Sequence, residues 1–533
     1  MKLIKPIAFF IALMSMMPAE AQSGIDNPIT KAVLQVYEQQ LRENPGDYIT
    51  RLRRAYEYYQ HDEYLRALDD VNQAIKATPA SEGDVLLQEY MLRAGIYNQT
   101  RKKEQALADL NAAYDIDPTS MQVINERANT EFDLGMYGDA KADYQRLRRL
   151  NSRNSQALLG LARVAIKENN YGLANEYLEE AVNLDPNNAE IYVRRASVRK
   201  QMGDHNNAVD DLLLAISSDS KNNKAIEALV EYGNTNYVAT MNGLTNAIRQ
   251  APNVGMFRYL RAVIAQAHYH YGAAIDDFNY IIDNNLYKYH GLHASIAECQ
   301  YALGRFDEAL SSIDYALGMI KDDARYFCLK AKILRALKRD DEAVNAAAQS
   351  LAVDRNYADG LVEMGLCYMA KENYKEAASL FGEAVMTDAE NPYYYMVRAW
   401  LLNDYMNQPA AARTFYEQVA DMDHFYIDNV RSLKGFAQLY IDRVTQAEAW
   451  MNNILTTVDD YDGFINYYGA CFYAMTGDND RALVCAEKSL KAGYANYYNW
   501  MYNTDARINV APLRDDLRFL NLLNRYDMIF KNN

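Results

Sequence analysis

The chain is poor in the residues that interrupt regular structure. Among its 533 residues there are only 11 Pro and 24 Gly. So low a content of both excludes collagen-like repeats and long low-complexity segments. Apolar residues make up 50% and charged residues 24% of the chain, as in ordinary folded proteins. Because one core rarely serves a chain of this length, we expect several domains or a repeat array.

Cysteine is also scarce, and its spacing excludes several kinds of site. The cysteines are Cys299, Cys328, Cys367, Cys471 and Cys485, and no two of them form a C-x-x-C pair. The zinc-ribbon and thioredoxin-like classes therefore have no support. The first cysteine lies far from the N-terminus, which excludes a lipid-attachment cysteine directly after a leader. We interpret all five as small packing residues, with Cys471 and Cys485 as the pair to test for a disulfide.

Basic residues and long hydrophobic runs are both in short supply. Lys and Arg number 55 against 71 Asp and Glu, a net charge of −16. Such a surface repels phosphate backbones, so we predict no nucleic-acid binding through a general basic face. The apolar run at residues 7–17 is shorter than the ~20 residues that span a bilayer. Lys2 and Lys5 precede it and Ala19-Glu20-Ala21 follows it, which is the layout of a secretory signal peptide.

Most of the chain is instead filled by a repeat with a modal period of 34 residues. Thirteen units share an anchoring small residue, another small residue twelve positions earlier, and an apolar residue four positions later. Small residues at fixed places on two successive helices allow their backbones to approach closely, and the larger residue fills the groove beside them. The alanines at the two small positions include Ala55, Ala67, Ala94, Ala106, Ala128, Ala140, Ala162, Ala174, Ala196, Ala208, Ala297, Ala309, Ala331, Ala343 and Ala377.

We number each unit so that the anchoring small residue is at position 20, which puts the earlier small residue at position 8 and the apolar residue at position 24. With an occasional Pro at position 32, this pattern resembles the tetratricopeptide repeat (TPR) family. The resemblance runs from about Tyr48 to Asn496. It implies an all-α fold, an α-solenoid wound as a right-handed superhelix of about thirteen helix-turn-helix units with helical caps. Glycines between the paired helices, such as Gly135 and Gly304, are expected at the chain reversals.

The register divides the chain into four expected parts. Residues 1–21 form the signal peptide and residues 22–47 an N-terminal capping helix. Residues 48–496 form the repeat array, and residues 497–533 a C-terminal helical cap. The weakest unit contains Tyr232 to Met241, where we expect a flexible point or a break in the superhelix.

Chemistry-bearing motifs are absent from the sequence. There is no phosphate-binding loop, dinucleotide fingerprint, nucleophile elbow or H-E-x-x-H, so we predict that the protein is not an enzyme and has no cofactor. His268 and His270 fall at the opposite end of the helices from His290 and His293, so no metal site is expected. Acidic pairs such as Asp210-Asp211 are interpreted as solvated helix faces rather than as acid–base pairs.

In the family that the chain resembles, the first helix of each unit lines the concave face. Positions 2, 5, 9, 12 and 13 then carry two aromatic patches, separated by basic residues such as Arg163 and Arg335. Aromatic side chains with few rotatable bonds make good peptide anchors, although the same residues also pack between neighbouring helices. The candidate partner-binding residues are Tyr56, Tyr59, Tyr393, Met396, Trp400, Phe436, Tyr440, Phe464 and Tyr467.

Two hypotheses of function follow. The first is a non-catalytic scaffold, periplasmic or secreted and without a transmembrane segment once the signal peptide is removed, that binds a protein or peptide on its concave face. Envelope assembly or secretion is its natural setting by analogy of fold. The second is a solenoid that binds carbohydrate or another small ligand in the aromatic groove. A clamp for a chaperone's C-terminal carboxylate is disfavoured, since no unit combines Lys at position 5 with Asn at position 9.

Overall fold

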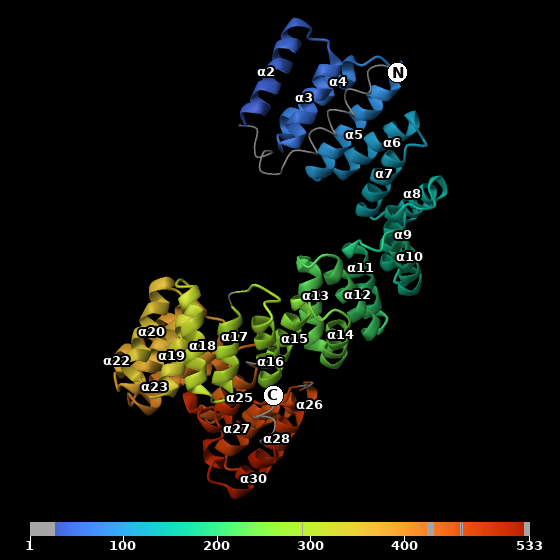
Figure 1. Ribbon diagram of the computed structural model, residues 1–533. Coiled ribbons are helices and arrows are strands. Elements are labelled where there is room, and N and C mark those ends of the chain that lie inside the picture. The colour runs from blue at the N-terminus through green and yellow to red at the C-terminus, as the bar shows by residue number, and fades with distance from the viewer. Residues whose placement is uncertain (1–26, 290, 424–430, 459, 461, 527–533) are drawn as a thin grey trace. The chain divides into compact units, whose positions relative to one another are not determined.

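The computed structural model describes residues 27–289, 291–423, 431–458, 460 and 462–526 (Figure 1). In these segments the fold is all-α, and thirteen consecutive helix pairs run from α3/α4 to α27/α28. The predicted helical repeat is thereby confirmed. The predicted signal peptide lies outside the described residues. None of the helices within those segments is both long enough and apolar enough to cross a membrane.

The succession of helix pairs divides into two compact units, and the boundary between Ala225 and Ile226 lies inside helix α13 (Asn223–Thr235). This boundary comes shortly before the stretch in which we expected a break. Each unit has its own succession of helix pairs and its own packed interior.

Unit 1 begins with the single helix α2 and continues with five helix pairs. Its helices are α2 (Pro28–Glu43), α3 (Tyr48–Gln60), α4 (Tyr64–Ala77), α5 (Gly83–Gln99), α6 (Lys103–Ile116), α7 (Met121–Asp133), α8 (Tyr137–Leu150), α9 (Ser155–Lys167), α10 (Tyr171–Leu184), α11 (Ala189–Gln201) and α12 (His205–Ser218).

Unit 2 continues the pairs and ends in shorter elements. After α13 come α14 (Tyr237–Gln250), α15 (Gly255–Ala267), α16 (Tyr271–Asp283), α17 (Leu292–Ala302), α18 (Phe306–Met319), α19 (Ala324–Ala336), α20 (Asp340–Val353), α21 (Ala358–Ala370), α22 (Tyr374–Thr387), α23 (Pro392–Asp404), α24 (Pro409–Ala420), α25 (Ser432–Tyr440), α26 (Val444–Thr457), α27 (Phe464–Met475) and α28 (Asn479–Ala492). The last elements are α29 (Tyr497–Met501), the 3₁₀ helices η3 (Asp505–Arg507) and η4 (Ala511–Leu513), and α30 (Leu517–Arg525).

The turn inside each helix pair has one repeated backbone geometry. Gly135 and Gly304 have positive φ angles of 78° and 76°, as expected for glycines at a chain reversal. The equivalent residues in other units adopt the same left-handed conformation without being glycine; Lys338, for example, has a φ of 61°. The turn is therefore imposed by the packing of the two helices and not by glycine alone.

Close approach of the paired helices depends on their small residues. The repeat alanines that the sequence singles out are all buried, with at most 3% of each exposed. Gly365 occupies the same position in the unit formed by α21 and α22, and a Cβ atom added there would lie 2.4 Å from the ring of Phe381. Phe381 is the larger residue at position 24, so the small residue and the large one fill a single space.

A second repeated contact ties the two helices of a pair together by charge. The Arg at position 7 of the first helix donates two hydrogen bonds to the Asp at position 23 of the second. In the first pair, Arg54 bonds both carboxylate oxygens of Asp70 at 2.6 and 2.7 Å. The same bidentate geometry recurs in Arg93–Asp109, Arg127–Asp143, Arg195–Asp211 and Arg261–Asp277. We call these five contacts the Arg–Asp pairs.

The Arg–Asp pairs correct our interpretation of the acidic doublets. Asp70, Asp211 and Asp277 were expected on solvated faces, but each is at most 5% exposed and bonded to an arginine. A carboxylate is buried only when a cation or donor compensates for its lost hydration, and the arginine sixteen residues earlier provides that compensation. Asp69, Asp210 and Asp276, the first member of each doublet, are not buried.

Two of the repeats that lack an Arg–Asp pair have other contacts in its place. In the unit formed by α9 and α10, Leu161 and Tyr177 stand where the Arg and Asp would be, and both belong to apolar clusters. In the unit formed by α25 and α26, Lys434 lies over the ring of Trp450 at 4.8 Å. An apolar pair and a cation–π contact therefore serve the same interface.

The cysteines and the prolines also have clear positions. All five cysteines are buried free thiols, so Cys471 and Cys485 do not form a disulfide in this structure. Burial raises the pKa of the Cys471 thiol to about 12 and that of Cys485 to about 11, which keeps both protonated near neutral pH. Pro392 and Pro409 begin helices α23 and α24, as the register predicts.

The Arg–Asp pairs lead to a first prediction, at Arg93 and Asp109. Asp109→Ala leaves the largely buried guanidinium of Arg93 without its partner, so we expect the unfolding free energy of unit 1 to fall by about 2–4 kcal/mol. The double variant Arg93→Leu/Asp109→Tyr copies the apolar pair Leu161 and Tyr177, and it should recover at least half of that loss. Urea unfolding followed by circular dichroism measures both values.

A matched control for this prediction is the surface ion pair of Arg339 and Glu342, in which both side chains are largely exposed. Glu342→Ala should leave the urea transitions essentially unchanged. If the double variant at Arg93 and Asp109 were less stable than Asp109→Ala, the charge-compensation argument would be wrong.

A second prediction concerns Glu89, which is fully buried on α5. Thr78 donates a hydrogen bond to its Oε1 at 2.7 Å, while its Oε2 has no hydrogen-bond partner among the described groups. Burial raises the pKa of Glu89 from 4.5 to about 7. Between these values the folded chain holds a proton that the unfolded chain has released, so this contribution to stability is complete below pH 4.5 and is lost as pH rises through 7.

Glu89→Gln should therefore weaken the pH dependence of stability. At pH 8 we expect the variant to be more stable than the parent by about 1–2 kcal/mol, and at pH 4.5 the two should be nearly equal. Urea unfolding at both pH values gives the comparison, with exposed Glu82→Gln as the control. Equal shifts at both pH values would contradict the assignment of a proton to Glu89.

Candidate functional site

The site that the repeat register indicates is the side of the first helices that carries positions 2, 5, 9, 12 and 13; we call it the first-helix face. In unit 1 it is formed by α3, α5, α7, α9 and α11, in which α3 contacts α5 and α7 contacts α9. It is rich in amide and apolar side chains. Its members include Tyr56, Tyr59, Gln88, Met91, Asn98, Gln122, Asn125, Asn129, Phe132, Asp133, Gln156, Leu159, Arg163, Ile166 and Glu190.

The two tyrosines predicted at the N-terminal end of this face are half-buried. The ring of Tyr59 lies 6.5 Å from that of Tyr56 and 6.1 Å from that of Tyr64, and its hydroxyl approaches Gly95 on the next first helix. Tyr56 and Tyr59 thus pack against neighbouring helices and also keep part of their rings accessible. The geometry shows the packing role that was weighed for them from sequence, and partner binding by their accessible parts stays a prediction.

At the centre of the face, the amide of Asn129 is held in one orientation. Tyr144 donates its hydroxyl proton to Asn129 Oδ1 at 2.7 Å, and Arg163 Nη1 donates to the same oxygen at 3.3 Å. Burial raises the pKa of Tyr144 to about 12, so its hydroxyl remains a donor. Two donors therefore require the oxygen of Asn129 to face them, which directs its amide nitrogen elsewhere.

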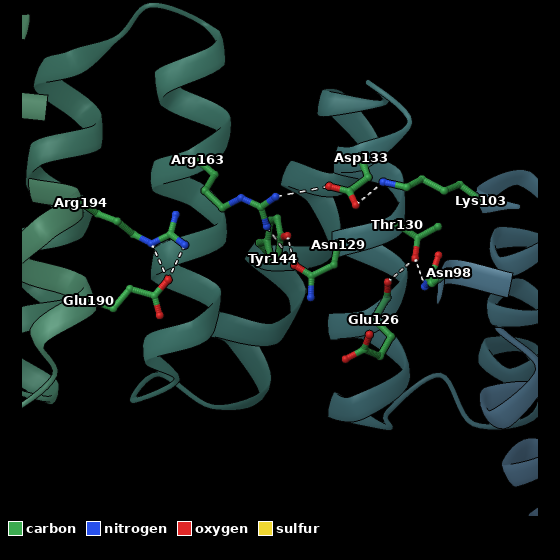
Figure 2. Close-up of polar contacts among 10 residues, drawn as sticks. All are labelled: Asn98, Lys103, Glu126, Asn129, Thr130, Asp133, Tyr144, Arg163, Glu190 and Arg194. Carbon is green, nitrogen blue, oxygen red and sulfur yellow. Dashed lines mark hydrogen bonds and ion pairs between the residues drawn. The ribbon is translucent and has the colours of Figure 1, made fainter. Parts of the chain in front are cut away.

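Figure 2 shows that no interaction is drawn to the amide nitrogen of Asn129, and no hydrogen bond from it is found among the described residues. The nitrogen carries two N–H donors. The side chain is therefore prepared to bond an acceptor from outside the chain, such as a main-chain carbonyl.

A charged group lies one turn along the same helix. Asp133 accepts from Lys103 Nζ at 2.5 Å and from Arg163 Nη2 at 3.4 Å (Figure 2). One carboxylate therefore joins two cations that come from the preceding and the following repeat of unit 1. The guanidinium of Arg163 also lies over the ring of Phe132 at 4.0 Å. These contacts hold Arg163 in place while 29% of its side chain stays exposed.

Further contacts order the two ends of this network. Asn98 Nδ2 on α5 donates to Thr130 Oγ1 on α7 at 3.1 Å, and Thr130 in turn donates to the carbonyl of Glu126 (Figure 2). Arg194 bonds Glu190 within α11. Because Asn98 and Arg163 contact α7 from opposite sides, the three first helices α5, α7 and α9 are linked by polar side chains.

The second predicted patch is not an open aromatic groove. Met396 and Phe436 are fully buried, Tyr467 is 2% exposed and Trp400 only 7%. Tyr393, Tyr440 and Phe464 are half-buried. The reason is that residues after α28 fold back across the first helices of unit 2, as Tyr440 shows by donating to the carbonyl of Ala506 at 3.4 Å.

The predicted basic residues between the two patches are likewise paired in unit 2. Arg335 bonds Glu363 at 2.7 Å and Asp505 at 3.4 Å, and Arg325 bonds Asp323 at 2.7 Å. Sequence reasoning missed Asp505 because it lies beyond the repeats and thus has no place in the register. It also missed the Arg–Asp pairs, although an Arg followed sixteen residues later by Asp in five units was a signal that the register contained.

The histidines do not assemble into a metal site in the part of the chain that the structure describes, where no group of three or more His, Cys, Asp or Glu is placed to hold an ion. His268 and His270 pack on the ring of Tyr237 at 4.5 and 5.3 Å. His293 lies 4.1 Å from the ring of Tyr315, and His290 lies outside the described residues.

Family models agree with the repeat register. Three models, each described as "Tetratricopeptide repeat", match residues 125–220 and 296–360, residues 334–401, and residues 90–120. Together these segments include helix pairs from both units. Tetratricopeptide repeats are scaffolds for binding protein or peptide partners.

Individual proteins are similar to parts of the chain. Cellulose synthase operon protein C of Pseudomonas fluorescens is 30% identical over 32% of this chain and 13% of that protein. DnaJ protein P58IPK homolog B of Oryza sativa is 21% identical over 55% of this chain and 61% of that protein. The chain therefore spans less than two thirds of each of these relatives.

Among solved structures, yeast Tom70 covers 77% of this chain and 99% of its own, with 13% sequence identity and a TM-score of 0.36. The helix pairs, their recurring small residues and the three family models are mutually consistent. The chain is a tetratricopeptide repeat protein with the fold of an α-solenoid.

Proposed function

We propose that this protein is an exported, non-catalytic scaffold that binds a partner polypeptide on the first-helix face of unit 1. The observation that carries the proposal is the orientation of Asn129, whose oxygen is occupied by Tyr144 and Arg163 while its amide nitrogen is left to donate. An extended polypeptide offers a carbonyl oxygen at every residue, so it is the partner that such a donor suits best.

The neighbours of Asn129 support the same class of partner. Gln122 and Gln156 are exposed on the adjacent first turns and supply further amide groups. Met91, Phe132 and Ile166 are half-buried and provide apolar area between them. A face that alternates amide donors with partly exposed apolar side chains recognises main chain and side chains together.

Export is part of the proposal because of the N-terminal sequence. A short basic region, an apolar run and Ala19-Glu20-Ala21 form a signal-peptide pattern, and this pattern supports a location of the mature chain in the periplasm or outside the cell. We propose a role in envelope assembly or secretion, where a repeat scaffold brings other proteins together. Fractionation of cells that express the full chain tests the location: a mature N-terminus near Gln22 supports export, and an uncleaved cytoplasmic chain contradicts it.

Site-specific photocrosslinking tests the binding face. A photoreactive amino acid placed at Gln122 or Gln156 should give a discrete adduct with a partner protein in the native cell envelope. The same amino acid at Gln145 or Glu179, which are exposed on the second helices α8 and α10, should give no such adduct. Adducts of equal yield at all four positions would contradict a partner site on the first-helix face.

A substitution sharpens this test. Asn129→Ala removes the amide donor, and loss of one hydrogen bond should lower the adduct yield from Gln122 by about three- to tenfold. Asn175→Ala, on the second helix α10, is the matched control and should leave the yield unchanged. If Asn129→Ala had no effect while the adduct formed normally, the assigned role of this amide would be wrong.

A further inference from the structure

The first-helix face of unit 2 already has an occupant, which is a segment of the same chain. After α28 the backbone turns at Gly493, with a φ of 106°, and residues 494–514 follow without forming another helix pair. In Figure 1 the C-terminal helices are red and lie beside the yellow-green helix α17, which α29 contacts. Contacts of α29 with α17 and of η3 with α23 bring this segment across the face.

One part of the segment is an anchor within the core. Tyr494, Trp500, Val510 and Leu513 are completely buried. Trp500 packs edge-on against Tyr467 of α27 at 4.9 Å and lies 6.0 Å from Phe519 of α30. These residues close the end of the solenoid, as a terminal cap must.

The other part reaches much further than a cap requires; we call residues 497–499 and 501–507, which lie on either side of the anchored Trp500, the tip. The ring of Tyr498 lies 4.7 Å from Tyr301 at the end of α17 and 6.2 Å from Phe306 at the start of α18. Tyr502 lies 5.3 Å from Phe306 as well. The tip therefore contacts a helix pair that is separated from α27/α28 by four other pairs in the sequence.

Two ion pairs hold the tip, which contributes the carboxylate to one of them and the guanidinium to the other. Asp505 accepts from Arg335 of α19 at 3.4 Å, and Arg507 donates to Asp404 of α23 at 2.5 Å. Between them, Tyr440 of α25 bonds the carbonyl of Ala506. The three residues that bond the tip lie at face positions of their repeats, with Arg335 at position 12 and both Asp404 and Tyr440 at position 13. The same positions form the first-helix face in unit 1.

Several features make the tip easier to displace than the anchor. Arg507 is 56% exposed, so its ion pair is weakened by water and salt. Arg335 already has a closer partner in Glu363, so it remains compensated when Asp505 leaves. Ala506 and Arg507 both have positive φ angles, of 52° and 58°, which residues with a Cβ adopt only when their surroundings hold them there.

We propose that the tip is an internal occupant of a second polypeptide-binding face, and that a partner segment of the same chemistry takes its place. That segment carries an aromatic side chain for the Tyr301 and Phe306 subsite and a carboxylate seven residues later for Arg335. The tip itself is the evidence for this partner, since Tyr498 and Asp505 have this spacing. The proposal is separate from the partner site of unit 1 and does not depend on it.

A peptide-binding experiment on the full chain tests the proposal. The variant Asp505→Lys/Arg507→Glu keeps the net charge but reverses both ion pairs, so it should release the tip while Trp500 and Leu513 keep the anchor in place. The probe is a fluorescent synthetic peptide with the sequence of residues 496–508, followed by fluorescence anisotropy. We expect the variant to bind it at least tenfold more tightly than the parent chain does.

The matched control is Lys491→Glu/Asp515→Lys, which makes the same two charge changes at exposed residues outside the tip. The control should bind the probe as weakly as the parent, and a probe with Lys in place of the residue equivalent to Asp505 should bind the variant weakly. If the variant and the control bound the probe equally, the proposal would be overturned.

The single variant Arg507→Glu covers the case in which the double reversal disturbs the fold. It changes only the more exposed ion pair, and we expect at least a threefold gain in probe affinity with unchanged helical content. Loss of helical content in both variants would show that the tip is part of the core. That result would contradict an exchangeable occupant.

Discussion

The close approach of two helices at positions 8 and 20 is the constraint on which the rest of the structure depends. A helix pair of this size cannot bury its apolar surface alone, so its neighbours must cover it at a fixed distance. Buried alanines such as Ala128 and Ala140 allow that distance, and a larger side chain such as Tyr144 fills the remaining groove. Once the distance is set, the same five positions of each first helix lie on one side.

Charge is used inside this framework as well as on its surface. The Arg–Asp pairs join the two helices of five units, and Asp211 is fully buried in one of them. Such pairs add little stability relative to apolar residues of the same size, but they are costly to break. They therefore favour one alignment of the two helices over others, and the apolar pair of Leu161 and Tyr177 shows that the interface also forms without charge.

The repeat and its turns could be predicted because they are local and recur at a fixed period. Thus Pro392 and Gly304 have the positions that the register gave them. The candidate site was harder to predict. The repeat register places Trp400 and Phe436 on the first-helix face. It contains no information about the irregular segment that covers them, because that segment is far away in sequence and lies outside the repeat. The orientation of Asn129 could not be predicted either, since the bonds from Tyr144 and Arg163 that orient it depend on side-chain geometry.

The two units thus present the same kind of face in two states. In unit 1 the oriented amide of Asn129 has no acceptor within the described chain. In unit 2 the tip supplies an aromatic ring, a carboxylate and a main-chain carbonyl to the equivalent positions. On this account one protein has one face available to a partner and a second that is released only by exchange.

Hydrogen–deuterium exchange of the full chain tests this account most directly. Within the tip, the amides of Tyr502 and Asn503 bond the carbonyl of Tyr498, and just after it the amide of Ile508 bonds that of Asp505. The account predicts that peptides from residues 498–508 exchange more slowly than an unstructured chain and faster than peptides from α27, because the tip opens while the anchor stays closed. Exchange at the rate of an unstructured chain would show that the tip does not occupy the face of unit 2, and exchange as slow as that of α27 would show that it is not displaceable.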